Sequence, residues 1–115
     1  MIKVTERSQY EPEYYTIDLT EVKTDRALHE TLHRSLDFRE PCGNNWNAFW
    51  DFLSEMSGVP LYIEVRGLES LQRRFPEDTE VLLDCLKDLK HYDHDRYIDI
   101  TRIVLVTGDV RTEIR

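Results

Sequence analysis

The chain has 115 residues, of which 40% are hydrophobic and 33% charged, so its size and composition predict one globular domain with a single hydrophobic core. Acidic residues (23) outnumber lysines and arginines (15), and the net charge of −8 disfavours direct binding to nucleic acid or an anionic membrane. This surplus favours a basic protein partner, although it also serves solubility. No segment reaches the roughly 20 apolar residues that span a bilayer, and the charged first residues do not resemble a secretory signal, so we expect a cytoplasmic protein. Cys42 and Cys85 are too few for a disulfide scaffold and are expected to be reduced and at least partly packed.

The first part of the chain predicts an arm, a strand and a helix. Residues 1–13 are polar without a clear period and are expected to form an N-terminal arm. Residues 14–19 alternate between apolar and polar side chains, the pattern of a strand with one buried face. Thr24 is a suitable N-cap for a helix that ends before Pro41. The narrow apolar stripe of this helix is formed by Leu28, Leu32 and Leu36.

A loop and a second helix follow. Residues 40–45 contain a proline, a glycine and paired asparagines, which is typical of a loop, and Asn45 is well placed to cap the next helix. Large apolar residues at spacings of three and four predict that helix over residues 46–56, and Gly58 and Pro60 supply its stop signal. These apolar residues are Trp46, Phe49, Trp50, Leu53 and Met56.

The second half of the chain predicts two more strands and two more helices. Residues 61–65 are rich in β-branched and aromatic side chains and predict a strand. Residues 68–75 predict a short helix, and Pro76 or Asp78 begins a longer one. The apolar face of the longer helix comprises Val81, Leu82, Cys85, Leu86 and Leu89.

The last predicted strand follows a polar break at residues 93–96. Residues 100–106 contain an unbroken apolar run, which is typical of a strand covered on both faces. Gly108 ends this strand, and a charged tail remains. Because strands joined by helical crossovers pair in parallel, the sequence predicts an α/β fold with a small three-stranded parallel sheet and about three to four helices. We expect one domain over residues 1–115, with a core of roughly 14–107.

Residues that could carry enzymatic chemistry are sparse. Segment 91–95 offers two imidazoles and two carboxylates, but a solvated turn after a helix explains the same residues. The alternative, a small metal-dependent hydrolase, would use His91, Asp93, His94 and Asp95. His29 and His33 lie four residues apart without a third ligand and are interpreted as surface residues. No P-loop, dinucleotide-binding or nucleophile-elbow motif is present, so we predict no enzymatic activity, no catalytic residues, no metal and no cofactor.

The most distinctive segment is residues 41–53, Pro-Cys-Gly-Asn-Asn-Trp-Asn-Ala-Phe-Trp-Asp-Phe-Leu. A Gly-x-Asn loop leads into a helix with small and aromatic residues and then a Trp-Asp pair, which resembles the signature of the barstar family. The order of elements over roughly residues 14–107 agrees with the fold of that family as well. The matching positions are Gly43, Asn45, Ala48, Trp50, Asp51 and Leu53.

The resemblance implies an intracellular inhibitor that occludes the active site of a basic ribonuclease in a one-to-one complex, and so acts as an immunity protein for the cell that makes the toxin. Asp51 is then the central acidic plug, Trp50 its aromatic neighbour and Asp88 the acid on the later helix. The partner-binding residues implied in this way are Gly43, Asn44, Asn45, Trp46, Asn47, Trp50, Asp51 and Asp88. The free protein is expected to be a monomer.

Two departures from the family pattern bear on the identity of the partner. Pro41-Cys42 replaces a pair of tyrosines, and Asn47 replaces an acid one helical turn before Asp51. Each change removes a contact of a kind that contributes strongly to interfaces. A barstar-like interaction module with a non-nuclease partner is therefore the main alternative.

Several of these residues also have a purely structural interpretation. Asn45 is suited to be a helix cap only, and Gly43 to satisfy a positive φ angle. Asp51 and Asp88, taken without the resemblance, are ordinary exposed helix carboxylates. Trp50 fits a core or an interface equally well. The residues expected to pack in the core are Trp46, Phe49 and Leu53.

Overall fold

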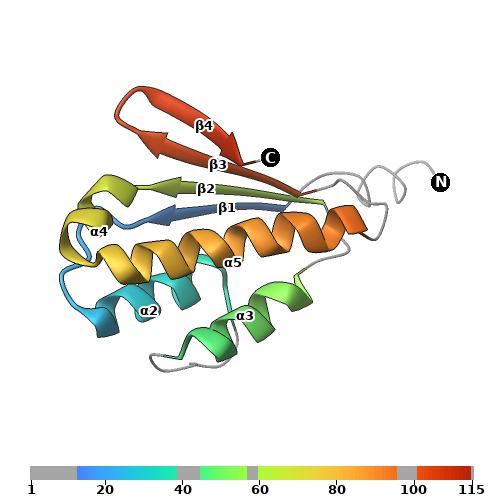
Figure 1. Ribbon diagram of the computed structural model, residues 1–115, viewed down its shortest axis with the longest axis horizontal. Helices are drawn as coiled ribbons and strands as arrows, with labels where there is room; N and C mark the ends of the chain where they lie inside the picture. Colours follow the sequence, from blue (N-terminus) through green and yellow to red (C-terminus); the bar gives the residue numbers. More distant parts are fainter. Residues whose placement is uncertain (1–12, 39–44, 57–59, 96–100, 115) are drawn as a thin grey trace, which may run out of the picture.

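The computed structural model describes residues 13–38, 45–56, 60–95 and 101–114, with side chains described for all of them except residues 92–95. Figure 1 shows the elements of this part of the chain. In order they are β1 (Glu13–Asp18), α2 (Asp25–Ser35), α3 (Trp46–Glu55), β2 (Leu61–Arg66), α4 (Leu68–Arg74), α5 (Pro76–Asp95), β3 (Thr101–Thr107) and β4 (Val110–Ile114).

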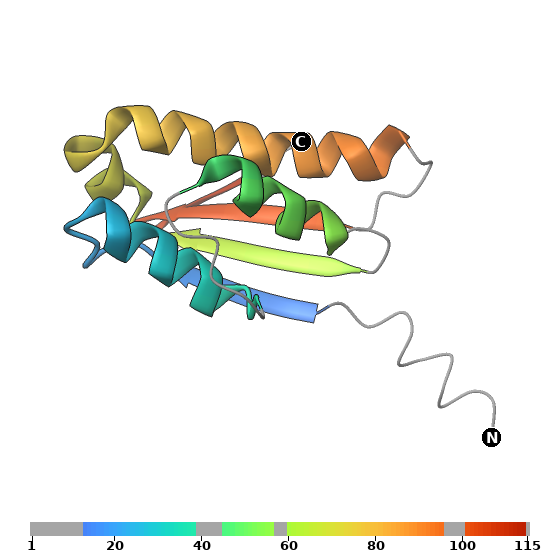
Figure 2. The same cartoon turned by 90° about the horizontal axis from the view of Figure 1, so that it is seen from below.

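The strands form one sheet in the order β1-β2-β3-β4, in which β1, β2 and β3 are parallel. Parallel neighbours need a crossover connection, which α2 and α3 provide between β1 and β2, and α4 and α5 between β2 and β3. Helices α2, α3 and α5 lie together on one side of the sheet (Figures 1 and 2). The predicted α/β class is confirmed.

The hydrophobic core lies between this helical layer and the sheet. Ile63 of β2 is in register with Tyr15 of β1 and Ile103 of β3, and both isoleucines are fully buried. Each large apolar side chain removed from water contributes roughly 1.5–3 kcal/mol to stability. The helices contribute the fully buried residues Leu28, Leu32, Phe49, Leu53, Leu71, Leu82, Leu86 and Leu89.

The charged C-terminal tail is a strand, so the expectation of three strands was one too few. Gly108 adopts a φ of 58° and begins the two-residue turn between Thr107 and Val110, the position that type II′ hairpin turns give to glycine. Strand β4 then pairs antiparallel with β3, and Ile114 is buried opposite Ile103. The sequence conceals this strand because only Val110 and Ile114 of the tail are apolar, so the alternation of a strand does not show.

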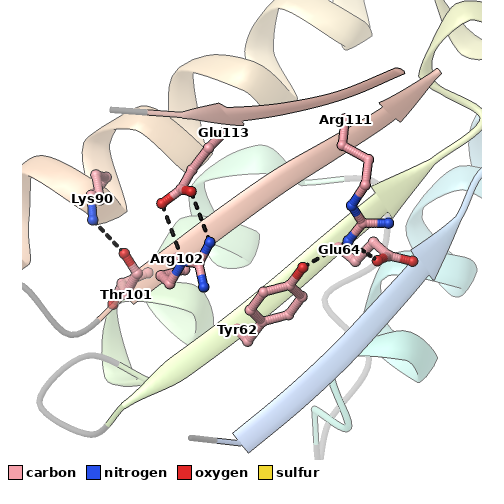
Figure 3. A network of polar contacts seen from close by, with 7 residues as sticks. All are labelled: Tyr62, Glu64, Lys90, Thr101, Arg102, Arg111 and Glu113. Atoms are coloured by element: carbon pink, nitrogen blue, oxygen red, sulfur yellow. Dashed lines mark hydrogen bonds and ion pairs between the residues drawn. The ribbon is translucent and has the colours of Figure 1, made fainter. Parts of the chain in front are cut away.

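The apolar run in β3 is buried on both faces, but the helices in the described part of the chain cover only one of them. On the other face Val104 and Val106 are 4% and 6% exposed. Arg111 of β4 reaches across β3 to β2, where its Nη2 donates to Glu64 Oε1 and to the Tyr62 hydroxyl, both at 2.8 Å (Figure 3). Long paired side chains therefore cover the valines of this face in place of a second helical layer.

Glu64 is the centre of this polar network. It accepts hydrogen bonds from Arg111 and from Arg66, and these bonds hold the pKa of its carboxyl below the usual value. A second pair, Arg102 with Glu113, joins β3 to β4 at 2.9 Å (Figure 3). The charges of the open sheet face are thus largely neutralised within the molecule.

Helix α5 continues to Asp95, beyond the start of the break that was predicted at residues 93–96. That segment contains no glycine or proline, and polar residues alone do not end a helix.

Residues 1–12 of the predicted N-terminal arm lie outside the described residues, whereas Glu13 belongs to β1. None of the described helices has both the length and the apolar character that crossing a membrane requires.

Candidate protein-binding site on helix α3

Helix α3 begins at a side-chain cap. The Asn45 Oδ1 atom accepts hydrogen bonds from the backbone N–H groups of Asn47 at 2.9 Å and Ala48 at 3.3 Å. These bonds satisfy two amides that have no partner inside the helix. The predicted capping role of Asn45 is confirmed. Gly43 and Asn44, the other predicted loop contacts, lie outside the described residues.

The two sides of α3 differ completely in burial. Phe49 and Leu53 are fully buried against the sheet, as predicted for core positions. Asn47, Asp51 and Glu55 follow one another at steps of four residues and are all exposed. We call these three residues the α3 ridge. A rigid helix thus holds the Asp51 carboxylate toward solvent, while its opposite side is fixed in the core.

Trp46 ties the start of α3 to two other helices. Its indole Nε1 donates to Asp78 Oδ1 of α5 at 3.1 Å, and its ring lies edge-on to His29 of α2, with centroids 4.6 Å apart. The side chain is half-buried and packs against the core, which agrees with the structural interpretation. Trp50 is also half-buried and packs against the core. A partner contact by either tryptophan remains a prediction.

His29 is a buried residue of the helical layer, and its interpretation as a surface residue was wrong. Its side chain is only 3% exposed, and its Nδ1 has no hydrogen-bond partner among the described residues. Burial lowers the pKa of the imidazole, and the charges of Asp25 and Asp78 offset this only in part. The sequence offered one signal for this burial. Because His29 directly follows Leu28, a slightly wider apolar stripe on α2 would have included it.

His33 was also interpreted as a surface residue, and it is half-buried. Its ring centroid lies 5.5 Å from that of Phe38 and 6.4 Å from that of Phe52. These aromatic neighbours come from the segment after α2 and from α3. Spacing along one helix could not reveal them, because both partners arrive from outside that helix.

Acidic charge is concentrated on α3 and α5. The sequence of α3 contains Asp51 and Glu55 and no lysine or arginine, and that of α5 contains seven acids and two lysines. The two helices pack against each other and are joined through Trp46. Asp51 and Asp88 are both exposed, and they lie on these two neighbouring helices. Most of the net charge of −8 therefore belongs to one pair of helices.

Metal-ligating side chains do not gather into a site within the described residues. No group of three or more histidine, cysteine or acidic side chains is close enough there to hold a metal ion. His91 is exposed near the end of α5, whereas the side chains of residues 92–95 lie outside the description. Burial, with smaller contributions from Asp88 and Asp84, raises the pKa of the Cys85 thiol to about 11. Cys85 is a buried free cysteine, which confirms the predicted packing, and Cys42 lies outside the described residues.

The chain matches a model of a known protein family. Residues 13–104 match the model described as Barstar (barnase inhibitor). The matched segment runs from the first residue of β1 into β3 and includes all of α3 and α5. It therefore contains the α3 ridge, Asp88 and most of the sheet, but not β4.

Proposed function

The chain belongs to the barstar family, and we propose that it inhibits a basic ribonuclease by placing the α3 ridge in the active site of that enzyme. Members of this family are inhibitors and not enzymes, and we extend that absence of catalysis to this chain. The proposed complex contains one copy of each protein. In our proposal the inhibitor acts in the cytoplasm and protects the cell that makes the nuclease.

The observation that carries the proposal is the placement of Asp51. Its carboxylate projects from the exposed side of a helix that is capped by Asn45 and anchored by Phe49. Little backbone freedom is then lost when the carboxylate enters a cleft, which favours tight binding. Guanidinium, ammonium and imidazolium groups that bind an RNA phosphate can make charge-assisted hydrogen bonds to a carboxylate instead.

The charge on α3 and α5 supports the same proposal. An excess of acid on one pair of helices attracts a basic active site over distances comparable to the Debye length, about 10 Å at 0.1 M salt. Association should therefore be fast at low salt and slow down as ionic strength rises. This field acts mainly on the encounter rate, and the Asp51 contact acts mainly on dissociation.

The test is inhibition of a panel of small basic ribonucleases, barnase-like enzymes included, by the wild-type protein and by Asp51→Ala at low and moderate salt. We expect tight inhibition by the wild type and a loss above about 2 kcal/mol for Asp51→Ala, roughly 30-fold in Kd. Barnase with its inhibitor is a standard case of such hot-spot behaviour, so this magnitude is general background for the family.

Glu69→Ala is the matched control, because Glu69 is also an exposed helix carboxylate but lies on α4. It removes the same charge and should leave inhibition nearly unchanged. Circular dichroism and thermal unfolding check that both variants fold. Equal weakening by the two variants would show that Asp51 contributes only through net charge, against the plug mechanism.

The uncharged Asn47 supports the second candidate, an interaction module with a non-nuclease partner. Asn47 is exposed on the α3 ridge one turn before Asp51, so the ridge offers one carboxylate fewer there than the family pattern does. If a normally folded protein inhibits no ribonuclease in the panel, the nuclease proposal fails. The partner is then to be sought by capture on the wild-type protein with Asp51→Ala as the comparison bait.

A further inference from the structure

A pocket lies beside the C-terminal end of α3, between that helix, the end of α2 and β1. Its cavity volume is about 300 Å³. Phe38 and Phe52 stack in its wall, with ring centroids 5.2 Å apart and planes 26° from parallel. Leu36 and Met56 complete the apolar part of the lining. This volume is at the lower end of the range for ligand pockets, which suits one amino-acid side chain better than a large cofactor.

The polar part of the lining is acidic. Asp37, Glu55 and Tyr15 contribute to it, and the described lining contains no lysine or arginine. The Tyr15 hydroxyl donates to Glu13 Oε1 at 2.7 Å. Burial, this hydrogen bond and the charges of Glu13 and Asp37 raise the pKa of Tyr15 to about 12. Among the described residues, the pocket therefore combines aromatic walls with acidic groups and contains no positive charge.

Asp37, which lines this pocket, has an unusual backbone conformation. The N–H of Phe38 bonds to His33 O at 3.0 Å and the N–H of Asp37 to Arg34 O at 3.3 Å, which together form a Schellman motif at the end of α2. Asp37 takes the left-handed position of that motif with a φ of 59°, where glycine is usual. Aspartate tolerates this conformation better than most residues but less well than glycine. An acidic side chain is thus present at a position where the backbone conformation favours glycine, which has no side chain.

We propose that this pocket, defined by Phe38, Phe52, Asp37 and Glu55, binds the guanidinium group of an arginine on a basic protein partner. A planar guanidinium can stack on an aromatic face and still pair with carboxylates at its edge, which a tetrahedral ammonium does less well. Glu55 belongs both to the pocket and to the α3 ridge, so the pocket continues the candidate interface. The proposal depends on the proposed function only for the identity of the partner that carries the arginine.

The test titrates the full-length, ¹⁵N-labelled protein with N-acetyl-arginine amide and follows the backbone amides by NMR. We expect saturable shifts confined to residues around the pocket, with a Kd on the order of 1 mM because a single side chain contributes little affinity. N-acetyl-citrulline amide, which has nearly the same shape without the charge, should bind at least about tenfold more weakly.

Two sets of variants locate the binding. Asp37→Asn with Glu55→Gln removes both carboxylates while keeping the side-chain shapes and the left-handed backbone, and should weaken arginine binding about tenfold or more. Glu69→Gln with Glu77→Gln removes the same charge from α4 and α5 and should leave binding unchanged. Phe52→Leu keeps an apolar wall without the π face and should weaken binding by a smaller factor.

Three outcomes overturn the proposal: equal binding of citrulline and arginine, equal weakening by both double variants, or arginine binding only after Arg39→Gln. The last outcome would mean that Arg39 of this chain, which follows Phe38 in the sequence, already fills the pocket. Asp51→Asn separates this proposal from the proposed function, because it should reduce nuclease inhibition and leave arginine binding intact. If no ribonuclease is inhibited but arginine still binds, only the proposed function fails.

Discussion

Helices α2 and α3 begin alike and lie in one layer, yet their exposed sides differ. Each has a side-chain oxygen as its N-cap, Thr24 Oγ1 on Ala27 N at 3.0 Å and Asn45 Oδ1 on Asn47 N at 2.9 Å. On the outer side of α2 Arg26 pairs with Glu30 at 2.9 Å. By sequence α2 carries two acids and two arginines, and α3 carries two acids and no base.

Burial and capping specify the fold in both helices, while the exposed charge distinguishes them. The paired charges of α2 are satisfied within the molecule and offer little to a partner. The carboxylates of α3 lie on a surface without a basic residue of the same helix, which is the arrangement that a basic partner can complete. The same contrast holds between α3 and the open sheet face, where Arg111 and Arg66 neutralise Glu64.

Core truncation should destabilise the protein strongly in both helices, and is the largest expected effect. Leu32→Ala in α2 should lower the free energy of unfolding by about 2–5 kcal/mol and Phe49→Ala in α3 by about 3–5 kcal/mol, since both side chains are fully buried. Urea unfolding monitored by circular dichroism measures both. Asp51→Ala should stay within about 0.5 kcal/mol of the wild type. A large stability loss in Asp51→Ala would show that Asp51 also stabilises the fold, so that the buried and exposed sides of α3 would not have separate roles.

Acid should weaken the contact between the two helices at His29. Because the folded-state pKa of His29 is lowered, the unfolded chain binds the proton first. Stability is therefore unaffected well above the ordinary histidine pKa of about 6.5 and falls as pH drops below it, by at most about 1.4 kcal/mol per pH unit.

Unfolding free energies measured between pH 8 and 5 test this effect of His29. The pH dependence should be flatter in His29→Leu than in the wild type and should persist in His91→Gln, a control at an exposed position. An unchanged slope in His29→Leu would mean that another group causes the loss. The two helices would then not be coupled through this imidazole.

Removing either cap should cost a similar, moderate amount of stability. Thr24→Ala and Asn45→Ala should each lower the free energy of unfolding by about 1 kcal/mol, because each leaves helix N–H groups without the side-chain acceptor. Only Asn45→Ala should also weaken nuclease binding, since it loosens the support of the α3 ridge. Asn45→Ser retains a cap and should recover most of the stability. A binding defect of equal size in Thr24→Ala would contradict the assignment of the interface to α3.

The ion pair on α2 should contribute least. Arg26 and Glu30 are 84% and 58% exposed, and exposed pairs four residues apart on a helix contribute about 0.3–0.5 kcal/mol. A double-mutant cycle with Arg26→Ala and Glu30→Ala measures the coupling at low and high salt. Added salt should reduce it toward zero. A large, salt-insensitive coupling would show that the outer side of α2 is more than a solvated surface.

The local signals in the sequence predicted much of the fold and part of the site. Apolar spacing separated the buried Phe49 and Leu53 of α3 from the exposed Asp51, and residue type identified Thr24 and Asn45 as caps. Both kinds of signal act within about one helical turn, so the sequence around each residue contains the information. The alternation of strands and helices predicted that the three strands pair in parallel, because each helix serves as the crossover that parallel neighbours require.

The α/β class, the N-cap and the buried and exposed sides of α3, and the acidic surplus of the chain thus follow from local sequence signals and composition. Tertiary structure alone decided the burial of His29, the pairing of β4 with β3, and the meeting of Phe38, Phe52 and Asp37 in one pocket. Each of these features joins residues that are distant in the chain or come from different elements. Periodicity describes which side of an element is apolar, but only packing selects the neighbour that covers it.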